Sequence, residues 1–153
     1  MSESEELPSR LSMDSGVILA YYLGEDLGQV VRDHVLEATG REIFHNRLCV
    51  AELCYVLCRR RGITLAIEYT KSYIDANYST LASSDDVDLM AAAYKCERAI
   101  SLADCYVIAV AKLKLATALF ARHEDDLDEE IGRKSFDVPI TFLEDLKRRP
   151  AST

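Results

Sequence analysis

The sequence contains no continuous apolar run of about 18 residues, the length at which a transmembrane helix is expected. The N-terminus also lacks the basic residues and apolar block of a secretory signal peptide, and carries Glu3, Glu5 and Glu6 instead. We therefore expect a cytoplasmic protein with no membrane partner.

Proline is scarce, and no linker, repeat or low-complexity segment divides the chain. Of the three prolines, Pro8, Pro139 and Pro150, two lie near the ends. A chain of 153 residues is the size of one ordinary domain, which buries roughly 70% of its unfolded surface. We expect a single domain over residues 11–148, a flexible acidic N-terminal tail over 1–10 and a C-terminal tail over 149–153.

The five cysteines form no recognisable metal or disulfide framework. Their number is odd, and they lie in apolar stretches. Cys54 and Cys58 are one helical turn apart, but no histidine or second cysteine pair completes a zinc site. We interpret all five as reduced, buried thiols.

Basic residues are in deficit, because 18 of them face 26 acidic residues and leave a net charge of −8. This balance repels phosphate backbones and argues against a protein that coats nucleic acid by charge. It does not exclude a nucleic-acid enzyme whose acidic residues bind a cation. The positions of the acids therefore matter more than their number.

Short apolar segments alternate with longer segments of helical periodicity. The pattern predicts strands at 11–13, 42–45, 80–82, 116–121 and 138–142, and helices at 17–23, 27–38, 48–61, 65–78, 85–98, 101–115 and 143–148. Residues 124–131 are expected to form a polar loop or helical turn, and Asp85 or Asp86 to cap the helix that follows. Alternating strands and helices predict an α/β fold, a three-layer α/β/α sandwich with a central, mainly parallel sheet.

Two acids lie inside apolar helical stretches. Glu52 is the only charged residue between 48 and 58, and Asp104 is the only one between 99 and 111. Burying an unpaired carboxylate costs several kcal/mol, so such positions suggest a function. Structural interpretations remain open, because Glu52 could share a polar helix edge with Arg59 and Asp104 could form a capping box with Ser101.

Other acids follow predicted strands. Asp14 comes directly after the first strand, where a helix cap is the structural alternative. The segment 122–126 follows the strand at 116–121, and of its acids we select Glu124, with Asp125 and Asp126 as alternatives and a solvated acidic turn as the structural interpretation.

These acids can converge, because parallel sheets place their sites at the carboxyl ends of the strands. Neighbouring carboxylates raise one another's pKa unless a divalent cation neutralises them. Ligand sets made of oxygen suit Mg²⁺ or Mn²⁺, which also bind substrate phosphates. We therefore predict a metal-assisted phosphoryl-transfer site.

The segments MDSGVILAYYLGE, VAELCYVL, SLADCYVIAVAKLKLATALFAR and DVPITFLEDL resemble a PIN domain of the VapC ribonuclease-toxin type. This resemblance implies a PIN-like fold and a Mg²⁺- or Mn²⁺-dependent endoribonuclease that leaves 5′-phosphate and 3′-hydroxyl ends. It implies metal ligation by Asp14 and Asp104, with Glu52 and Glu124 binding directly or through water. Many relatives have Thr or Ser two residues before an Asp at the fourth position, so the departure here keeps Asp125 and Asp126 as alternatives.

The resemblance also implies partners, namely an RNA substrate, a small antitoxin protein that covers the acidic groove, and a second copy in a homodimer. Arg59 and Arg60 are the candidate RNA-binding residues, with Lys112 and Lys114 beyond Asp104. Basic residues at a helix C-terminus also complement the helix dipole, which is the structural interpretation. Alternative functions are a catalytically inert PIN-fold interaction module and a housekeeping RNA-processing nuclease.

Overall fold

The computed structural model describes residues 7–148, and the strands within this range form one parallel sheet. The strand order is β3-β2-β1-β4-β5. The strands are β1 (Arg10–Met13), β2 (Glu42–His45), β3 (Thr80–Leu81), β4 (Thr117–Phe120) and β5 (Ile140–Phe142). Each overlaps a strand predicted from the sequence, and the predicted parallel sheet is confirmed.

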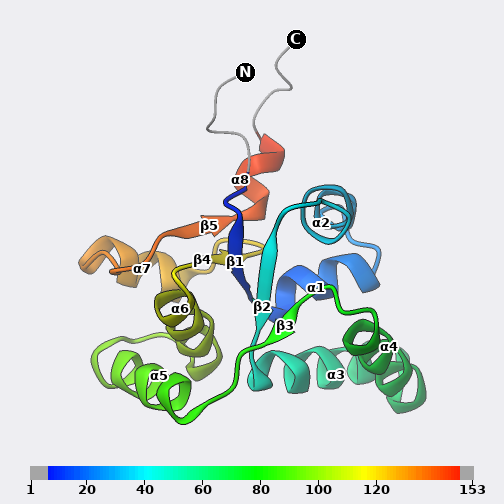
Figure 1. The fold of residues 1–153 in the computed structure, drawn as a ribbon, viewed down its shortest axis with the longest axis horizontal. Coiled ribbons are helices and arrows are strands. Elements are labelled where there is room, and N and C mark those ends of the chain that lie inside the picture. The colour runs from blue at the N-terminus through cyan, green and yellow to red at the C-terminus, as the bar shows by residue number, and fades with distance from the viewer. Residues whose placement is uncertain (1–6, 149–153) are drawn as a thin grey trace.

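The helices occupy both faces of this sheet (Figure 1). The helices are α1 (Ser15–Tyr22), α2 (Gly28–Val31), η2 (Arg32–Leu36), α3 (Arg47–Arg61), α4 (Ile63–Asp75), α5 (Asp85–Glu97), α6 (Leu102–Lys114), α7 (Asp125–Arg133) and α8 (Leu143–Arg148). The predicted helix at 27–38 is α2 continuing into the π-helical turn η2. Residues 124–131, expected as a loop or single turn, form most of α7, because three acids in its first turn complement the helix dipole.

Side chains of the central strands alternate between two helical layers, as the period of a β-strand requires. Leu11 and Met13 of β1 belong to a core shared with α1, α2, α3 and α4. Ser12 faces the other layer, where its hydroxyl donates to the backbone oxygen of Val107 on α6 at 2.7 Å. A second core joins α5, α6 and α7 to β4 and β5. The predicted three-layer α/β/α sandwich is therefore confirmed.

Short polar side chains cap the helices that follow the strands. Asp14 caps α1, Asn46 caps α3 and Ser101 caps α6, each by accepting from a backbone N–H. The cap of α5 is Ser84, which accepts from Val87, so the expectation that Asp85 or Asp86 would cap it is wrong. Both acids lie in the first turn instead, where they favour the same helix end.

The predicted tails and the predicted burial of the cysteines are each met only in part. Residues 1–6 and 149–153 of the two predicted tails lie outside the described residues, whereas Leu7 is buried and Arg10 begins β1. Cys49 and Cys105 are buried free thiols, but Cys96 is exposed, so the expected burial fails for that residue. Within the described range, no helix has the length and apolarity needed to cross a bilayer.

Candidate active site

Four segments bring their acids to the carboxyl edge of the sheet. Asp14 directly follows β1, and α3, which carries Glu52, begins just after β2. Helix α6 leads into β4, so its first turn, with Asp104, lies at the same edge. Glu124 follows β4 and occupies the N-cap position of α7. The predicted convergence therefore follows from the topology of the sheet.

Asp14 is fixed at the strand-to-helix turn. Its Oδ2 accepts from the backbone N–H of Gly16 at 3.1 Å, and its own N–H donates to Leu119 of β4 at 3.0 Å. Burial, followed by the charges of Glu52 and Glu124, raises the pKa of Asp14 to about 6. A Cβ at position 16 would lie 3.0 Å from Oδ2, so glycine leaves this carboxylate its space.

Glu52 lies one helical turn and a half into α3, close to the start of α1. Its Oε1 accepts from the hydroxyl of Ser15 at 3.4 Å. Burial raises the pKa of Glu52, and the charge of Asp104 raises it further. Within the described residues, Arg59 forms no ion pair with Glu52 and lies over the ring of Tyr55, with its Cζ 5.0 Å from the ring centroid.

Asp104 is the most deeply buried of the four acids. It is 8% exposed, and burial raises its pKa to about 7, with further contributions from the charges of Asp14 and Glu124. The hydroxyl of Ser101, which caps α6 by accepting from the N–H of Asp104 at 3.1 Å, lowers this pKa only in part. The predicted capping interaction between Ser101 and Asp104 is therefore present, and the pKa of Asp104 is raised all the same.

Electrostatic coupling separates the three candidates for the fourth acid. The charge of Glu124 raises the pKa of Asp14, Glu52 and Asp104. Asp126 contributes only to the pKa of Asp104, and Asp125 to none of the three. Glu124 also makes no side-chain hydrogen bond as the cap of α7. Of the three, Glu124 is thus the acid whose charge acts on all three of the other carboxylates.

The chemistry of these four acids suits a hard divalent cation, but their side chains are not close enough together to ligate one ion. No lysine, arginine or histidine in the described range forms an ion pair with Asp14, Glu52 or Asp104. Oxygen donors with uncompensated charge suit Mg²⁺ or Mn²⁺. Among residues 7–148, however, no three His, Cys, Asp or Glu side chains are near enough to hold one ion.

The sequence matches the PIN domain family over residues 12–129. The chain belongs to the PIN-domain family. No curated protein sequence matches it. Among solved structures, it is similar to the Sarcin-Ricin loop cleaving toxin VapC20 of Mycobacterium tuberculosis, with 16% identity, a TM-score of 0.63, and coverage of 79% of this chain and 95% of the toxin.

Complexes from two other bacteria contain chains of the same fold. VapBC2 from Rickettsia felis, bound to a DNA fragment from its promoter, matches with 11% identity and a TM-score of 0.62 over 87% of this chain and 98% of that chain. FitAcB from Neisseria gonorrhoeae matches with 17% identity and a TM-score of 0.58 over 88% and 98%. At these identities the likeness shows the PIN fold, and the predicted family resemblance is confirmed.

A cleft of about 230 Å³ opens beside the acids of this PIN domain. Asp14 and Glu124 line it, together with Arg60 from the end of α3. Arg122 lines it as well, but its guanidinium is paired with Asp26 at 2.5 Å. Arg60 is therefore the predicted basic residue that the structure brings next to the acids, while Arg59 stacks on Tyr55.

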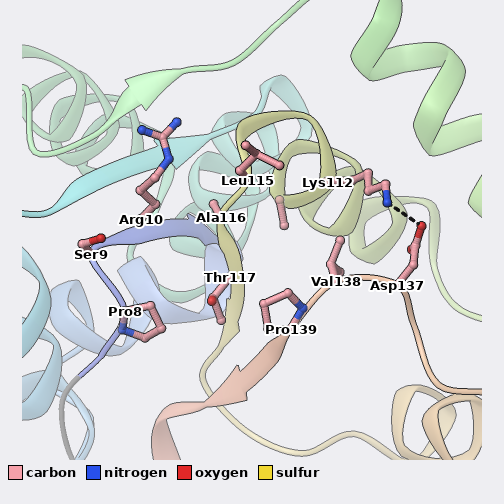
Figure 2. A pocket seen from close by; sticks show the side chains of 11 residues that line it. Pro8, Ser9, Arg10, Lys112, Leu115, Ala116, Thr117, Asp137, Val138 and Pro139 are labelled. Carbon is pink, nitrogen blue, oxygen red and sulfur yellow. Dashed lines mark ion pairs between the residues drawn. The ribbon is translucent and has the colours of Figure 1, made fainter. Parts of the chain in front are cut away.

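A larger cavity of about 340 Å³ lies at the opposite, amino edge of the sheet (Figure 2). Lys112 lines it and pairs with Asp137 at 3.0 Å, and Arg10 pairs with Glu42 at 2.7 Å. Lys112 and Lys114 end α6, whereas Asp104 begins it, so these lysines lie far from the acids along the helix. The expectation that they would contact RNA near Asp104 is not supported.

Two polar side chains that follow β1 and β2 at this edge were not identified from the sequence. Ser15 donates to Glu52, and Asn46 is a buried cap of α3 whose Nδ2 has no hydrogen-bond partner in the described structure. Both follow a strand directly or after one residue, which is the signal that could have indicated them. Cys49 is buried beside the group, and the charges of Asp14 and Glu52 add to the effect of burial in raising the pKa of its thiol.

Proposed function

We propose that this PIN domain is a Mg²⁺- or Mn²⁺-dependent endoribonuclease, and the toxin of a VapBC-type pair. In this proposal Asp14 and Asp104 bind the metal, while Glu52 and Glu124 bind it directly or through water. The family supports the proposal, because the resemblance identified from the sequence implies this activity.

The observation that carries the proposal is the state of Asp104. A carboxylate that is 8% exposed, with a pKa of about 7 and other carboxylates as its nearest charges, is costly to keep in a fold. A divalent cation offsets that cost, because it neutralises several carboxylates at once. Perturbed acids of this kind cluster at functional sites.

The residues around the cleft can have different roles in phosphodiester hydrolysis. When bound, the metal supplies Lewis-acid chemistry, lowering the pKa of a coordinated water and stabilising charge on the phosphate. Asp14 and Asp104 would hold the metal, and Ser15 donates to Glu52 and so orients its carboxylate. Arg60, which lines the cleft, offers a guanidinium to an RNA phosphate near the acids.

Asp104→Asn is the direct test, because the change removes the charge and keeps the shape. We expect the variant to lose at least about a thousandfold in RNA cleavage, the size of effect of removing a major catalytic group. Asp86→Asn, an exposed acid in the first turn of α5, is the matched control and should cleave at the wild-type rate. The assay is cleavage of a labelled RNA with Mn²⁺, with Mg²⁺ and with a chelator. If Asp104→Asn cleaves RNA at the wild-type rate, the proposed role of Asp104 as a metal ligand is wrong.

Arg60→Gln tests the proposed RNA contact. Loss of one phosphate contact should raise KM by roughly tenfold and reduce the dependence of binding on salt. Arg59→Gln, at a stacked position on the neighbouring residue, should change KM less. Equal effects of the two variants would contradict a specific role for Arg60.

We further propose an antitoxin partner and a homodimer in the cytoplasm. The support is that VapBC and FitAcB, which share the fold, are complexes. Exposed apolar side chains on α4, namely Ile63, Leu65, Ile67 and Ile74, provide contact area on this chain. Light scattering of the purified protein, alone and with the product of the adjacent reading frame, tests both. A monomer that does not bind that product would contradict both the proposed homodimer and the proposed antitoxin partner.

The inert PIN-fold module is the second candidate, and one observation favours it. The acids of the described chain are not at ligand spacing. An inert module would bind no Mn²⁺ and would cleave RNA no faster than the Asp104→Asn variant does.

A further inference from the structure

Helix α7 carries Glu124 at its N-cap, yet few side chains anchor it. Its only buried residues are Leu127 and Glu130. Near its start, His123 pairs with Asp128 and with Asp145, each at 2.9 Å, and stacks on the ring of Phe142 with the ring centroids 3.8 Å apart. The start of α7 is therefore held through His123, and the direction of its axis depends on how Leu127, Glu130 and the partly buried Ile131 are held.

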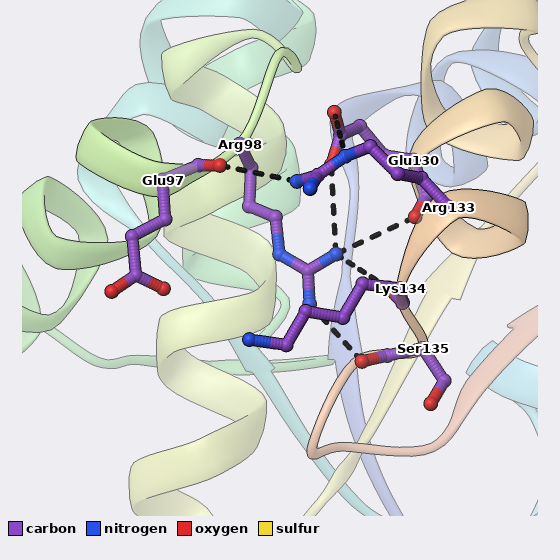
Figure 3. Close-up of polar contacts among 6 residues, drawn as sticks. All are labelled: Glu97, Arg98, Glu130, Arg133, Lys134 and Ser135. Carbon is purple, nitrogen blue, oxygen red and sulfur yellow. Dashed lines mark hydrogen bonds and ion pairs between the residues drawn. The ribbon is translucent and has the colours of Figure 1, made fainter.

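Arg98 holds the far end of α7 (Figure 3). Its Nη1 donates to the backbone oxygens of Glu130 and Lys134, and its Nη2 donates to that of Ser135 at 3.1 Å. The guanidinium also lies over the ring of Phe136, with 3.9 Å between Cζ and the ring centroid. Arg98 itself is 8% exposed. Its planar group thus binds the C-terminal end of α7 and the residues that follow.

Glu130 completes this connection with its side chain. Its Oε2 lies 3.5 Å from Nη1 of Arg98 and 2.8 Å from Nη2 of Arg133. Arg133, then the backbone N–H of Ala99, lower the pKa of Glu130. Arg133 also donates to the backbone oxygen of Glu97 at 3.2 Å. The end of α7 is therefore joined to residues 97–99, the turn between α5 and α6.

That turn leads directly to Asp104. Arg98 is the C-cap of α5, and α6 begins at Leu102 with Asp104 in its first turn. The polar network thus joins the segment that positions Asp104 to the helix that positions Glu124. Because a short α-helix is rigid, fixing one end sets the direction of the other.

We propose that Arg98 is a positioning residue for the metal site, acting through α7 to set the place of Glu124 relative to Asp104. The inference rests on the proposed function, since it assumes that these acids share a cation. Arginine is required here because its planar fork reaches several oxygens at once, which a lysine ammonium cannot do. Outer residues of this kind tune a metal without touching it.

Arg98→Met tests the proposal, with Mn²⁺ affinity measured by electron paramagnetic resonance and RNA cleavage measured in parallel. We expect Mn²⁺ affinity to fall by about tenfold, the lower end for outer-shell partners of a metal site. Glu130→Gln, which keeps the size of the side chain, should weaken Mn²⁺ binding in the same direction and serves if the first variant does not fold. Arg32→Met, at a 45% exposed side chain on η2 outside this network, is the matched control and should keep wild-type affinity.

A double-mutant cycle separates positioning from general loss of stability. If Arg98 acts through Glu124, then Arg98→Met should weaken Mn²⁺ binding in the wild type but not in a Glu124→Gln background. The same holds for Glu130→Gln. Additive losses would overturn the proposal, as would wild-type affinity in both Arg98→Met and Glu130→Gln. A wild-type protein that binds no Mn²⁺ would overturn the proposed function as well.

Discussion

Asp104 and Glu130 are two carboxylates buried to nearly the same depth, 8% and 6% exposed, with opposite electrostatics. Glu130 lies between Arg98 and Arg133, and its pKa is lowered. Asp104 lies near Asp14 and Glu124, and its pKa is raised to about 7. Burial alone therefore does not mark a functional acid in this fold.

The neighbours of each carboxylate make the difference. Glu130 has its counter-charges within the chain, so its role is complete once the protein folds. The counter-charge of Asp104 is not supplied by the described chain, so the fold keeps an acid that it does not neutralise. Proteins accept such a cost at sites where a ligand offsets it. Three predictions test this contrast.

Arg98→Met should produce the largest change in stability. Glu130 keeps Arg133 as its counter-charge, but the backbone oxygens of Lys134 and Ser135 lose the donor that Arg98 supplies, at a cost of about 1–3 kcal/mol each. Chemical unfolding of the variant with and without Mn²⁺ measures this loss. Arg133→Met removes an exposed partner of the same carboxylate and should cost much less, because solvent screens that pair. Equal losses in the two variants would show that burial of the Arg98 pair contributes nothing.

Asp104→Asn should have the opposite sign. Without metal and at about pH 8, the wild-type carboxylate is charged and repelled by Asp14 and Glu124, so neutralising it should stabilise the fold by about 1–3 kcal/mol. Chemical unfolding in a chelator measures the difference. A variant less stable than the wild type would indicate that the carboxylate is a structural cap of α6.

The stability of the metal-free protein should depend on pH through the same carboxylates. The pKa of Asp104 is about 7 in the fold, against an ordinary value of 3.8. The pKa of Asp14 is about 6 in the fold, against the same ordinary value. Between these limits the folded state holds more protons, so stability falls as pH rises from about 4 to 7, by up to about 1.4 kcal/mol per pH unit for each group.

Thermal unfolding in a chelator at about pH 5 and pH 8 measures this slope. Asp104→Asn should flatten it, while Asp86→Asn should leave it unchanged. A wild-type protein that becomes more stable over the same range would contradict the raised pKa values.

Much of the fold could be predicted from the sequence, because its information is local. Apolar period and length identified each strand, and the alternation of strands with helices predicted the parallel sheet. Asp14, Glu52 and Asp104 were identified because a charge inside an apolar stretch, or just after a strand, is visible in one dimension. Their convergence needed only the rule that parallel sheets place sites at the carboxyl edge.

The features that were missed depend on contacts distant in the sequence. The sequence does not distinguish the buried Arg98 from the arginines on the surface. Its acceptors lie 32 to 37 residues further along the chain, and most are backbone oxygens. The choice among Glu124, Asp125 and Asp126 required the orientation of α7. That segment was expected to be a polar loop or helical turn because its buried face consists of only Leu127 and Glu130.

Mn²⁺ binding at about pH 8, followed by electron paramagnetic resonance, tests the central claim that these carboxylates form one cation site. The account predicts that wild-type protein and Asp86→Asn bind Mn²⁺ equally, and that Asp104→Asn binds at least about tenfold more weakly. Equal binding by all three proteins, or no binding by the wild type, would contradict it.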